Sequence, residues 1–177
     1  VLAARGMFYV GDKNVLPDVS GRNDPANYHI VSSISSRNEW TKEEAYIQGM
    51  NNVITTLQQA GKKVVVFVDN PELDFNAINC IPRPIPLLAP DRTTACSIPR
   101  DKAFKLIDPY RKVIAQLAAR YKNSNVRFYD ASKILCDEQR CYAGNESMLL
   151  YRDSNHLSQR GSKKVMGDFI EWLDKER

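Results

Sequence analysis

A continuous apolar run at residues 63–69, KVVVFVD, constrains the fold more than any other segment of the sequence. Its central residues lack the apolar–polar alternation of a strand that has one side in solvent. The run therefore predicts a strand that is buried on both faces, as in parallel sheets whose crossover helices cover both sides. Predicted strands and helices alternate along the chain, and this order predicts an α/β fold with a parallel sheet flanked by helices.

The other predicted elements complete this pattern. Strands are expected at 1–10 and 126–130. A first helix opens at the capping box formed by residues 41–44, TKEE, and ends at Gly61. A second helix spans about 101–121, and Asp108-Pro109 supplies an N-cap and a proline that predict a break or restart within it. A last helix begins after Ser158.

Apolar residues at helical spacing predict which face of each helix is buried. In the first helix they are Ile47, Met50, Val53, Ile54 and Leu57. In the second they are Ile107, Tyr110, Val113, Ile114, Leu117 and Tyr121, and in the last Val165, Met166, Phe169, Ile170 and Leu173. The basic residues Arg160, Lys163 and Lys164 are expected on the solvated face of the last helix.

Size and composition favour one globular domain that covers residues 1–177. The hydrophobic content of 43% and the charged content of 26% are ordinary for a globular chain. No apolar run approaches the roughly 18 residues that a membrane helix requires. The net charge of +4 is spread among acidic residues, which argues against nucleic acid as a partner.

The four cysteines fall in two irregular segments of the chain. Their spacing does not match the tight pairs of a structural zinc site, so no metal is expected. Cys136 and Cys141 would close a small loop as a disulfide, and Cys80 and Cys96 would close a long ordered loop at 71–100 that holds most of the prolines. Two such disulfides indicate an oxidising compartment, whereas four reduced thiols would be compatible with the cytosol.

The run at residues 150–161, LYRDSNHLSQRG, carries the candidate chemistry. It places Asp153 three residues before His156 on a loop that leads into the last helix. A hydrolase triad needs a carboxylate that fixes the imidazole tautomer and a histidine that takes the nucleophile's proton. A lone D-x-x-H is typical of a capped turn with a packed histidine. The longer string D-x-x-H-L-S-x-x-G, at this place in an α/β order, favours Asp153 and His156 as catalytic residues.

This string resembles the C-terminal block of the SGNH (GDSL-like) esterase and acyltransferase superfamily. More narrowly, it resembles the SGNH domain fused to membrane acyltransferase family three, whose members O-acylate bacterial surface polysaccharides. Supporting matches lie at 1–5 (VLAAR), 57–63 (LQQAGKK), 68–73 (VDNPEL), 135–141 (LCDEQRC) and 150–153 (LYRD). The resemblance covers nearly the whole chain, but only the later two-thirds of the family's domain. It implies a flavodoxin-like fold whose first strand and helix are absent from this sequence.

The resemblance also implies a serine nucleophile in a Gly-Asp-Ser turn, which is expected upstream of Val1. Gly11-Asp12-Lys13 is a candidate for a decayed version of that turn, with lysine in place of serine. Residues 21–24, GRND, spell the superfamily's G-x-N-D oxyanion block, but do not follow a convincing core strand. Asn23 there, or Arg5 at the end of the VLAAR stretch in the first predicted strand, could donate to the oxyanion.

The function implied by the resemblance is O-acyl transfer, most often of acetyl, to a cell-surface glycan on the extracytoplasmic side of a bacterial membrane. The implied partners are a glycan acceptor, an acyl donor and an upstream transmembrane acyltransferase domain, with no cofactor. The chain alone is expected to be inactive because it lacks the nucleophile. Two alternatives remain open: a free-standing carbohydrate esterase, and a non-catalytic glycan-binding domain of the same fold.

Overall fold

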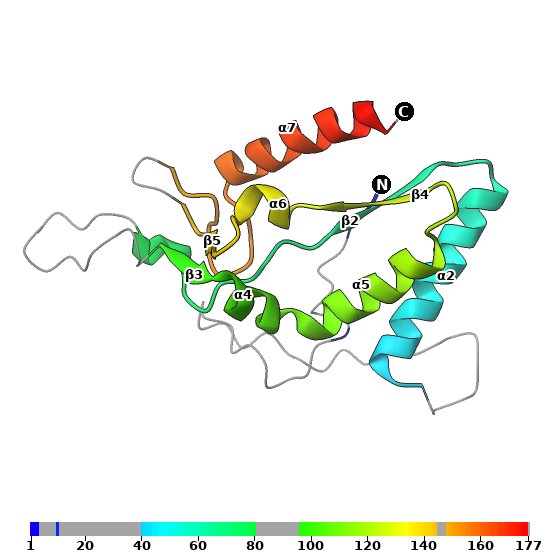
Figure 1. Ribbon diagram of the computed structural model, residues 1–177, viewed down its shortest axis with the longest axis horizontal. Coiled ribbons are helices and arrows are strands. Elements are labelled where there is room, and N and C mark those ends of the chain that lie inside the picture. Colours follow the sequence, from blue (N-terminus) through cyan, green and yellow to red (C-terminus); the bar gives the residue numbers. More distant parts are fainter. Residues whose placement is uncertain (4–9, 11–39, 81–95, 145–147, 177) are drawn as a thin grey trace, which may run out of the picture. The chain divides into compact units, whose positions relative to one another are not determined.

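The computed structural model describes residues 1–3, 10, 40–80, 96–144 and 148–176 (Figure 1). The described residues fall into two compact units. We call residues 1–3, 10, 40–69 and 107–130 the sheet unit, and residues 70–80, 96–106, 131–144 and 148–176 the disulfide unit.

The sheet unit is built on a parallel three-stranded sheet in the order β1-β2-β4. The strands are β1 (Leu2–Ala3), β2 (Val64–Val68) and β4 (Val126–Asp130), and Val66 of β2 pairs with Leu2 on one side and Phe128 on the other. All residues of β2 except Phe67 are buried, which confirms the prediction of a central strand covered on both faces. The parallel sheet and its flanking helices confirm the predicted α/β class.

Helix α2 (Lys42–Gln59) begins and ends where the sequence predicts. The Thr41 hydroxyl accepts a hydrogen bond from the Glu44 backbone N–H, and the Glu44 carboxylate accepts one from the Thr41 N–H at 2.8 Å. Gly61 takes a φ of +70°, a conformation that favours glycine, directly after the helix. The capping box and the terminal glycine are both confirmed.

The predicted buried face of α2 is wrong at Val53, whose exposed fraction is 44%. Ile54 is fully buried, as predicted, and a polar residue, Asn51, is also buried, with an exposed fraction of 6%. The Tyr121 hydroxyl donates a hydrogen bond to Asn51 Oδ1 at 3.0 Å, which satisfies this buried acceptor. A polar residue can therefore take a core position that hydrophobic spacing alone assigns to a neighbour.

The predicted helix at 101–121 is two helices, α4 (Arg100–Leu106) in the disulfide unit and α5 (Asp108–Arg120) in the sheet unit. The predicted restart at Asp108-Pro109 is confirmed, but the N-cap is Ile107 and not Asp108. Asp108 lies in the first turn of α5, where its carboxylate pairs with Lys112. A negative charge is favourable both at the N-cap and in the first turn of a helix, so the presence of Asp108 does not show which of these two positions it occupies.

Of the strand predicted at 1–10, the structure confirms Leu2–Ala3, but Val10 is helical and buried, and the residues between lie outside the described part of the chain. A run of ten residues is long for a strand, for which five or six are usual. The predicted irregular loop at 71–100 is also partly regular. Its described ends hold a 3₁₀ turn η1 (Ala77–Cys80), strand β3 (Ser97–Pro99) and the start of α4.

The disulfide unit contains an antiparallel pair formed by β3 and β5 (Arg140–Tyr142), and helices α4, α6 (Ser132–Leu135) and α7 (Gln159–Lys175). Both predicted cysteine pairs are bonded, Cys80 with Cys96 and Cys136 with Cys141. Cys96 immediately precedes β3, and Cys141 lies within β5 and is fully buried. The disulfides therefore anchor the short strands of this unit.

Helix α7 buries Gly161, Val165 and Phe169. The predicted burial of Met166 and Ile170 is wrong, because their exposed fractions are 43% and 56%. The buried stripe of α7 is thus narrower than its apolar stripe.

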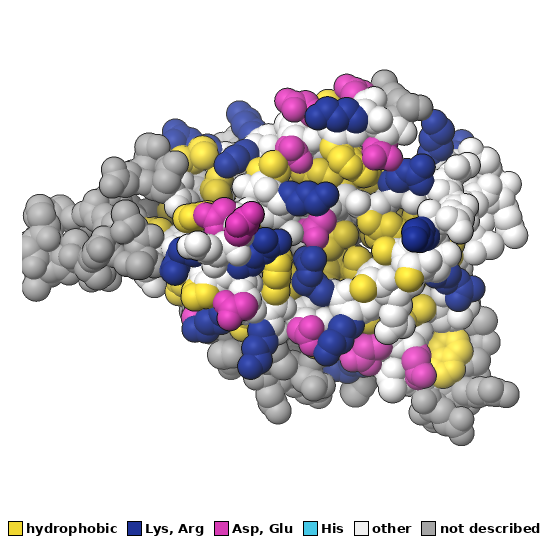
Figure 2. Space-filling model, viewed as in Figure 1, with side chains coloured by type: hydrophobic (Ala, Val, Ile, Leu, Met, Phe, Trp, Pro, Cys, Tyr) yellow, Lys and Arg dark blue, Asp and Glu magenta, His cyan; other side chains and the backbone are white. Residues whose placement is uncertain are grey.

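Basic and acidic side chains are interspersed over the face of the molecule in Figure 2. None of the helices within the described residues has the length and apolarity needed to cross a bilayer.

Candidate functional site

The candidate site is a loop of the disulfide unit between the bridge partners Tyr151 and Leu157, which we call the site loop. These two residues pair in antiparallel fashion, and the Arg152 N–H donates to the His156 carbonyl at 2.8 Å. The loop is thereby closed at its base, with Asp153, Ser154 and Asn155 at its tip.

The structure brings the two predicted site residues together at the tip of this loop. The Nδ1 atom of His156 lies 2.9 Å from Oδ2 and 3.1 Å from Oδ1 of Asp153. An ionised carboxylate can only accept, so Nδ1 carries the hydrogen and Nε2 of the neutral ring is left with its lone pair. The His156 side chain has an exposed fraction of 57%, against 20% for Asp153. The pair therefore places an oriented, accessible imidazole over a sheltered carboxylate.

Asp153 also organises the backbone of the loop. Its Oδ1 accepts hydrogen bonds from the N–H of Asn155 at 3.0 Å and of His156 at 2.7 Å. This is the capped turn that a lone D-x-x-H suggests. The same carboxylate thus caps the turn and holds the imidazole, so the structural and catalytic interpretations are compatible.

The electrostatics of the loop keep Asp153 ionised. Partial burial by itself raises the pKa of its carboxyl, because burial disfavours the charged form. The hydrogen bonds from the Asn155 and His156 N–H groups and from the His156 ring outweigh this effect, so the net pKa lies below its usual value. The Arg152 guanidinium is 3.4 Å from Oδ2 and places a positive charge beside the carboxylate. An ionised carboxylate is the form that can stabilise an imidazolium.

The start of α7 fixes the C-terminal side of the loop. Ser158 is the N-cap, and its hydroxyl accepts from the Gly161 N–H at 3.0 Å while donating to the Leu149 carbonyl. A Cβ added at Gly161 would lie 1.9 Å from the Leu150 carbonyl oxygen. Only glycine allows this approach, which gives a physical reason for the glycine that ends the string D-x-x-H-L-S-x-x-G.

The opposite side of the loop is held by residues for which the sequence suggested no role in the site. The buried Tyr151 hydroxyl donates to the Pro71 carbonyl at 2.7 Å, and the Leu73 N–H donates to the Ser154 carbonyl at 2.8 Å. These partners are about eighty positions apart in the chain, as the separation of 80 between Tyr151 and Pro71 shows. No short-range spacing could have revealed them.

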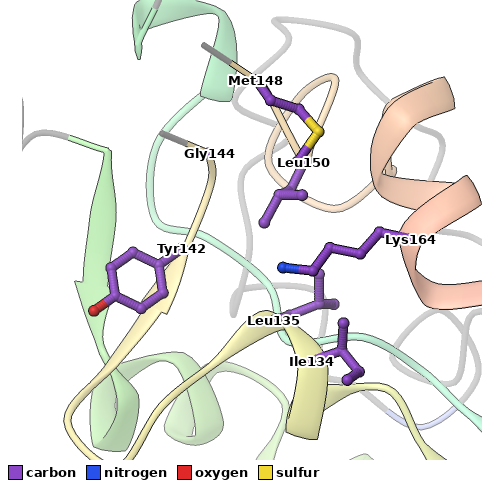
Figure 3. Close-up of a pocket in the computed structure, with 7 residues that line it drawn as sticks. All are labelled: Ile134, Leu135, Tyr142, Gly144, Met148, Leu150 and Lys164. Carbon is purple, nitrogen blue, oxygen red and sulfur yellow. The ribbon is translucent and has the colours of Figure 1, made fainter. Parts of the chain in front are cut away.

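A pocket of about 230 Å³ lies elsewhere in the disulfide unit, between α6, β5 and α7 (Figure 3). Lys164 extends from α7 toward Leu135, with its nitrogen pointing into the pocket and Leu150 lying above it. The Tyr142 hydroxyl points away from the pocket and donates to Asp137. Neither Asp153 nor His156 lines this pocket, so it takes no part in the chemistry considered below.

The remaining predicted contributors lie outside the described residues: Arg5, Lys13 and Asn23. In the described part of the chain, no hydroxyl forms a hydrogen bond with the His156 ring. Over the same residues, no group of three or more His, Cys, Asp or Glu side chains could hold a metal ion. The pair can thus supply an oriented base, and needs a nucleophile to act upon.

The family model described as "SGNH domain (fused to AT3 domains)" matches residues 1–171. This span includes the three strands of the sheet, helices α2 and α5, and the complete site loop. Comparisons with curated proteins and with solved structures gave no significant match.

Proposed function

Because the chain belongs to the family of SGNH domains fused to AT3 domains, we propose that it acts in O-acyl transfer to a bacterial cell-surface polysaccharide. Membership in this family supports an acyltransferase or esterase type of function. Acetyl is the acyl group that we propose. The observation that carries the proposal is the hydrogen bond between Asp153 and Nδ1 of His156, since it leaves Nε2 ready to accept a proton.

In the proposed mechanism, Nε2 of His156 takes the proton of a serine hydroxyl while the serine Oγ attacks the acyl carbonyl of the donor. The donor's acyl bond then breaks, and the imidazolium gives its proton to the leaving group. In the second half, a glycan hydroxyl attacks the acyl-serine while Nε2 takes its proton. The bond between the acyl group and the serine Oγ then breaks, and Nε2 gives the proton to that oxygen. Asp153 keeps the ring oriented and stabilises the imidazolium in both halves.

The proposal requires further parts that the described residues do not supply. One is the serine of a Gly-Asp-Ser turn, and another is an oxyanion donor, for which Arg5 and Asn23 are the candidates. The fusion named by the family model supports a transmembrane acyltransferase domain as partner, which we propose presents the acyl donor. We further propose that residues 1–177 form a single SGNH-like domain and that no cofactor is needed.

We place the domain on the extracytoplasmic side of the membrane. Its two disulfides support this location, because such bonds persist in oxidising compartments. The glycan acceptor would be met on the same side.

The test is the O-acetyl content of surface polysaccharide in cells that make the intact gene product containing this chain. His156→Ala should abolish acetylation, and Asp153→Asn should lower its rate by roughly 10⁴-fold, as expected when the ring loses its orienting carboxylate. Lys163→Ala, an exposed change on α7, is the control and should leave acetylation intact. Unchanged acetylation in His156→Ala would refute the proposal. Release of acetate into water, with no transfer, would favour the esterase alternative.

A further inference from the structure

We infer that Asn70 is a positioning residue for the Asp153–His156 pair, acting through the backbone of the site loop. Three consecutive carbonyl oxygens of the loop accept hydrogen bonds from one segment, residues 70–77. The donors are Ala77 N–H to Asp153 at 3.4 Å, Leu73 N–H to Ser154 at 2.8 Å, and the Asn70 side-chain amide to Asn155 at 2.9 Å. We call residues 70–77 the clamp segment.

The bond from Asn70 acts on the peptide unit that joins Asn155 to His156. The carbonyl of this unit accepts from Asn70 Nδ2, and its N–H donates to Asp153 Oδ1 at 2.7 Å. The plane is therefore held at both ends, by an amide on one side and the carboxylate on the other. This peptide unit ends at the His156 Cα. Fixing its plane therefore fixes the position from which the His156 side chain extends.

The preceding peptide unit repeats the arrangement. The Ser154 carbonyl accepts from the Leu73 N–H, and the Asn155 N–H donates to Asp153 Oδ1 at 3.0 Å. Hydrogen bonding to a carbonyl polarises its peptide and strengthens donation by the N–H on the other side. The clamp segment thus supports both backbone donors that hold Asp153 in place.

Asn70 is the member of this arrangement that a substitution can remove selectively, because its donor is a side chain. Its Nδ2 also lies 3.3 Å from the Pro71 carbonyl, the acceptor of the Tyr151 hydroxyl. The side chain thus contacts two carbonyls that hold the loop, that of Pro71, which also accepts from Tyr151, and that of Asn155. Asn70 follows β2, whose last residue is Val68, so the clamp begins where a buried strand ends.

The inference predicts a change in the imidazole that loss of stability alone would not cause. Asn70→Asp keeps the shape of the side chain but replaces the donor with an acceptor that faces the Asn155 carbonyl. We expect the neutral His156 ring to lose part of its Nδ1–H tautomer, read from its ¹⁵N shifts by NMR. Asn70→Ser, whose hydroxyl is too short to reach Asn155, should act in the same direction but less.

The control is Asn79→Ala, an exposed asparagine in η1, which should leave the tautomer as in the wild type. Ring shifts are read on the folded resonances, so a lower melting temperature does not obscure them. An unchanged tautomer in both Asn70 variants would overturn the inference and leave Asn70 a purely structural residue.

The role in catalysis rests on the proposed function and is measured separately. In acyl transfer by the intact gene product, Asn70→Asp should lower kcat roughly 10- to 100-fold, as for a misplaced catalytic group, with KM little changed. A change in KM alone would contradict the positioning role. If His156→Ala retains transfer, the proposed function fails, while the tautomer measurement on this chain still decides whether Asn70 orients the ring.

Discussion

The sheet unit and the disulfide unit keep their residues in place by different means. In the sheet unit, β2 pairs residue by residue with β4 from Val64 to Val68, and buried valines cover its faces. In the disulfide unit, the site loop has no regular structure, and its carbonyls are satisfied by a segment about eighty residues earlier in the chain. The scaffold is thus specified by patterns within short stretches, whereas the site depends on polar contacts between residues that are far apart in the chain.

This difference explains how an irregular loop can hold Asp153 and His156 in a defined geometry. The two peptide units that join Ser154 to Asn155 and Asn155 to His156 are each bonded through the carbonyl to the clamp segment and through the N–H to Asp153. Satisfying backbone groups in this way replaces the ladder of a sheet. Changes in the two units should therefore have separable effects, on stability alone or on stability together with the imidazole.

The largest effect is expected from Gly161→Ala. The new Cβ would meet the Leu150 carbonyl oxygen at 1.9 Å, and backbone cannot give way as a flexible side chain can. We expect a loss of about 3 kcal/mol in the free energy of unfolding, at the upper end of typical overpacking costs, with shifted His156 resonances.

The matched control is Gly167→Ala on the same helix, where an added Cβ meets nothing within 4 Å. It should stabilise the protein by about 1 kcal/mol through helix propensity and leave His156 unchanged. Chemical denaturation followed by circular dichroism measures both. Equal effects of the two substitutions would show that α7 does not constrain the site loop.

A pair of tyrosines compares the units directly. Tyr151→Phe removes the donor to the Pro71 carbonyl in the disulfide unit, and Tyr121→Phe removes the donor to Asn51 Oδ1 in the sheet unit. Tyr121→Phe leaves the buried Asn51 oxygen without this donor and should cost about 1–3 kcal/mol of unfolding free energy. Tyr151→Phe should cost about 1 kcal/mol, because the Pro71 carbonyl keeps its hydrogen bond from Asn70 Nδ2 at 3.3 Å. Only Tyr151→Phe should alter the NMR signals of the His156 ring. A similar change in Tyr121→Phe would contradict the separation of the units.

The smallest expected effect concerns how the free energy of unfolding changes with pH in acid solution. The pKa of Asp153 is lowered in the folded protein, so its contribution is present above its unfolded pKa, about 3.9, and is lost as the pH falls through the lower folded value. Asp153→Asn should be less stable than the wild type at neutral pH, and this gap should close below about pH 4. A gap that stays constant down to acid pH would show that the charge of Asp153 does not stabilise the loop.

The sequence allowed much of the sheet unit to be predicted because its signals are local. The apolar run of β2, the capping box at Thr41 and the glycine after α2 each act within a few residues. The errors in predicted burial arose where residues distant in the sequence determine whether a side chain is buried. Ile170 is exposed despite lying on the apolar stripe of α7, and Asn51 is buried because Tyr121 supplies its partner.

For the candidate site, the sequence predicted Asp153 and His156 but not what holds them. A spacing of three residues can be recognised in the sequence, and the structure places these side chains in hydrogen-bond contact. Asn70 and Tyr151 carry no such signal, because their partners are defined only by the folded chain. Their roles follow from the carbonyls that they satisfy.

The most direct test of the account is the position of the hydrogen on the neutral His156 ring. The ¹⁵N shifts of its two ring nitrogens report which one is protonated, and His156→Gln assigns the signals. The account predicts a hydrogen on Nδ1, directed at Asp153, and a free lone pair on Nε2. A ring protonated mainly on Nε2 would have no base to offer a serine hydroxyl, and would contradict the assignment of Asp153 and His156 as a catalytic pair.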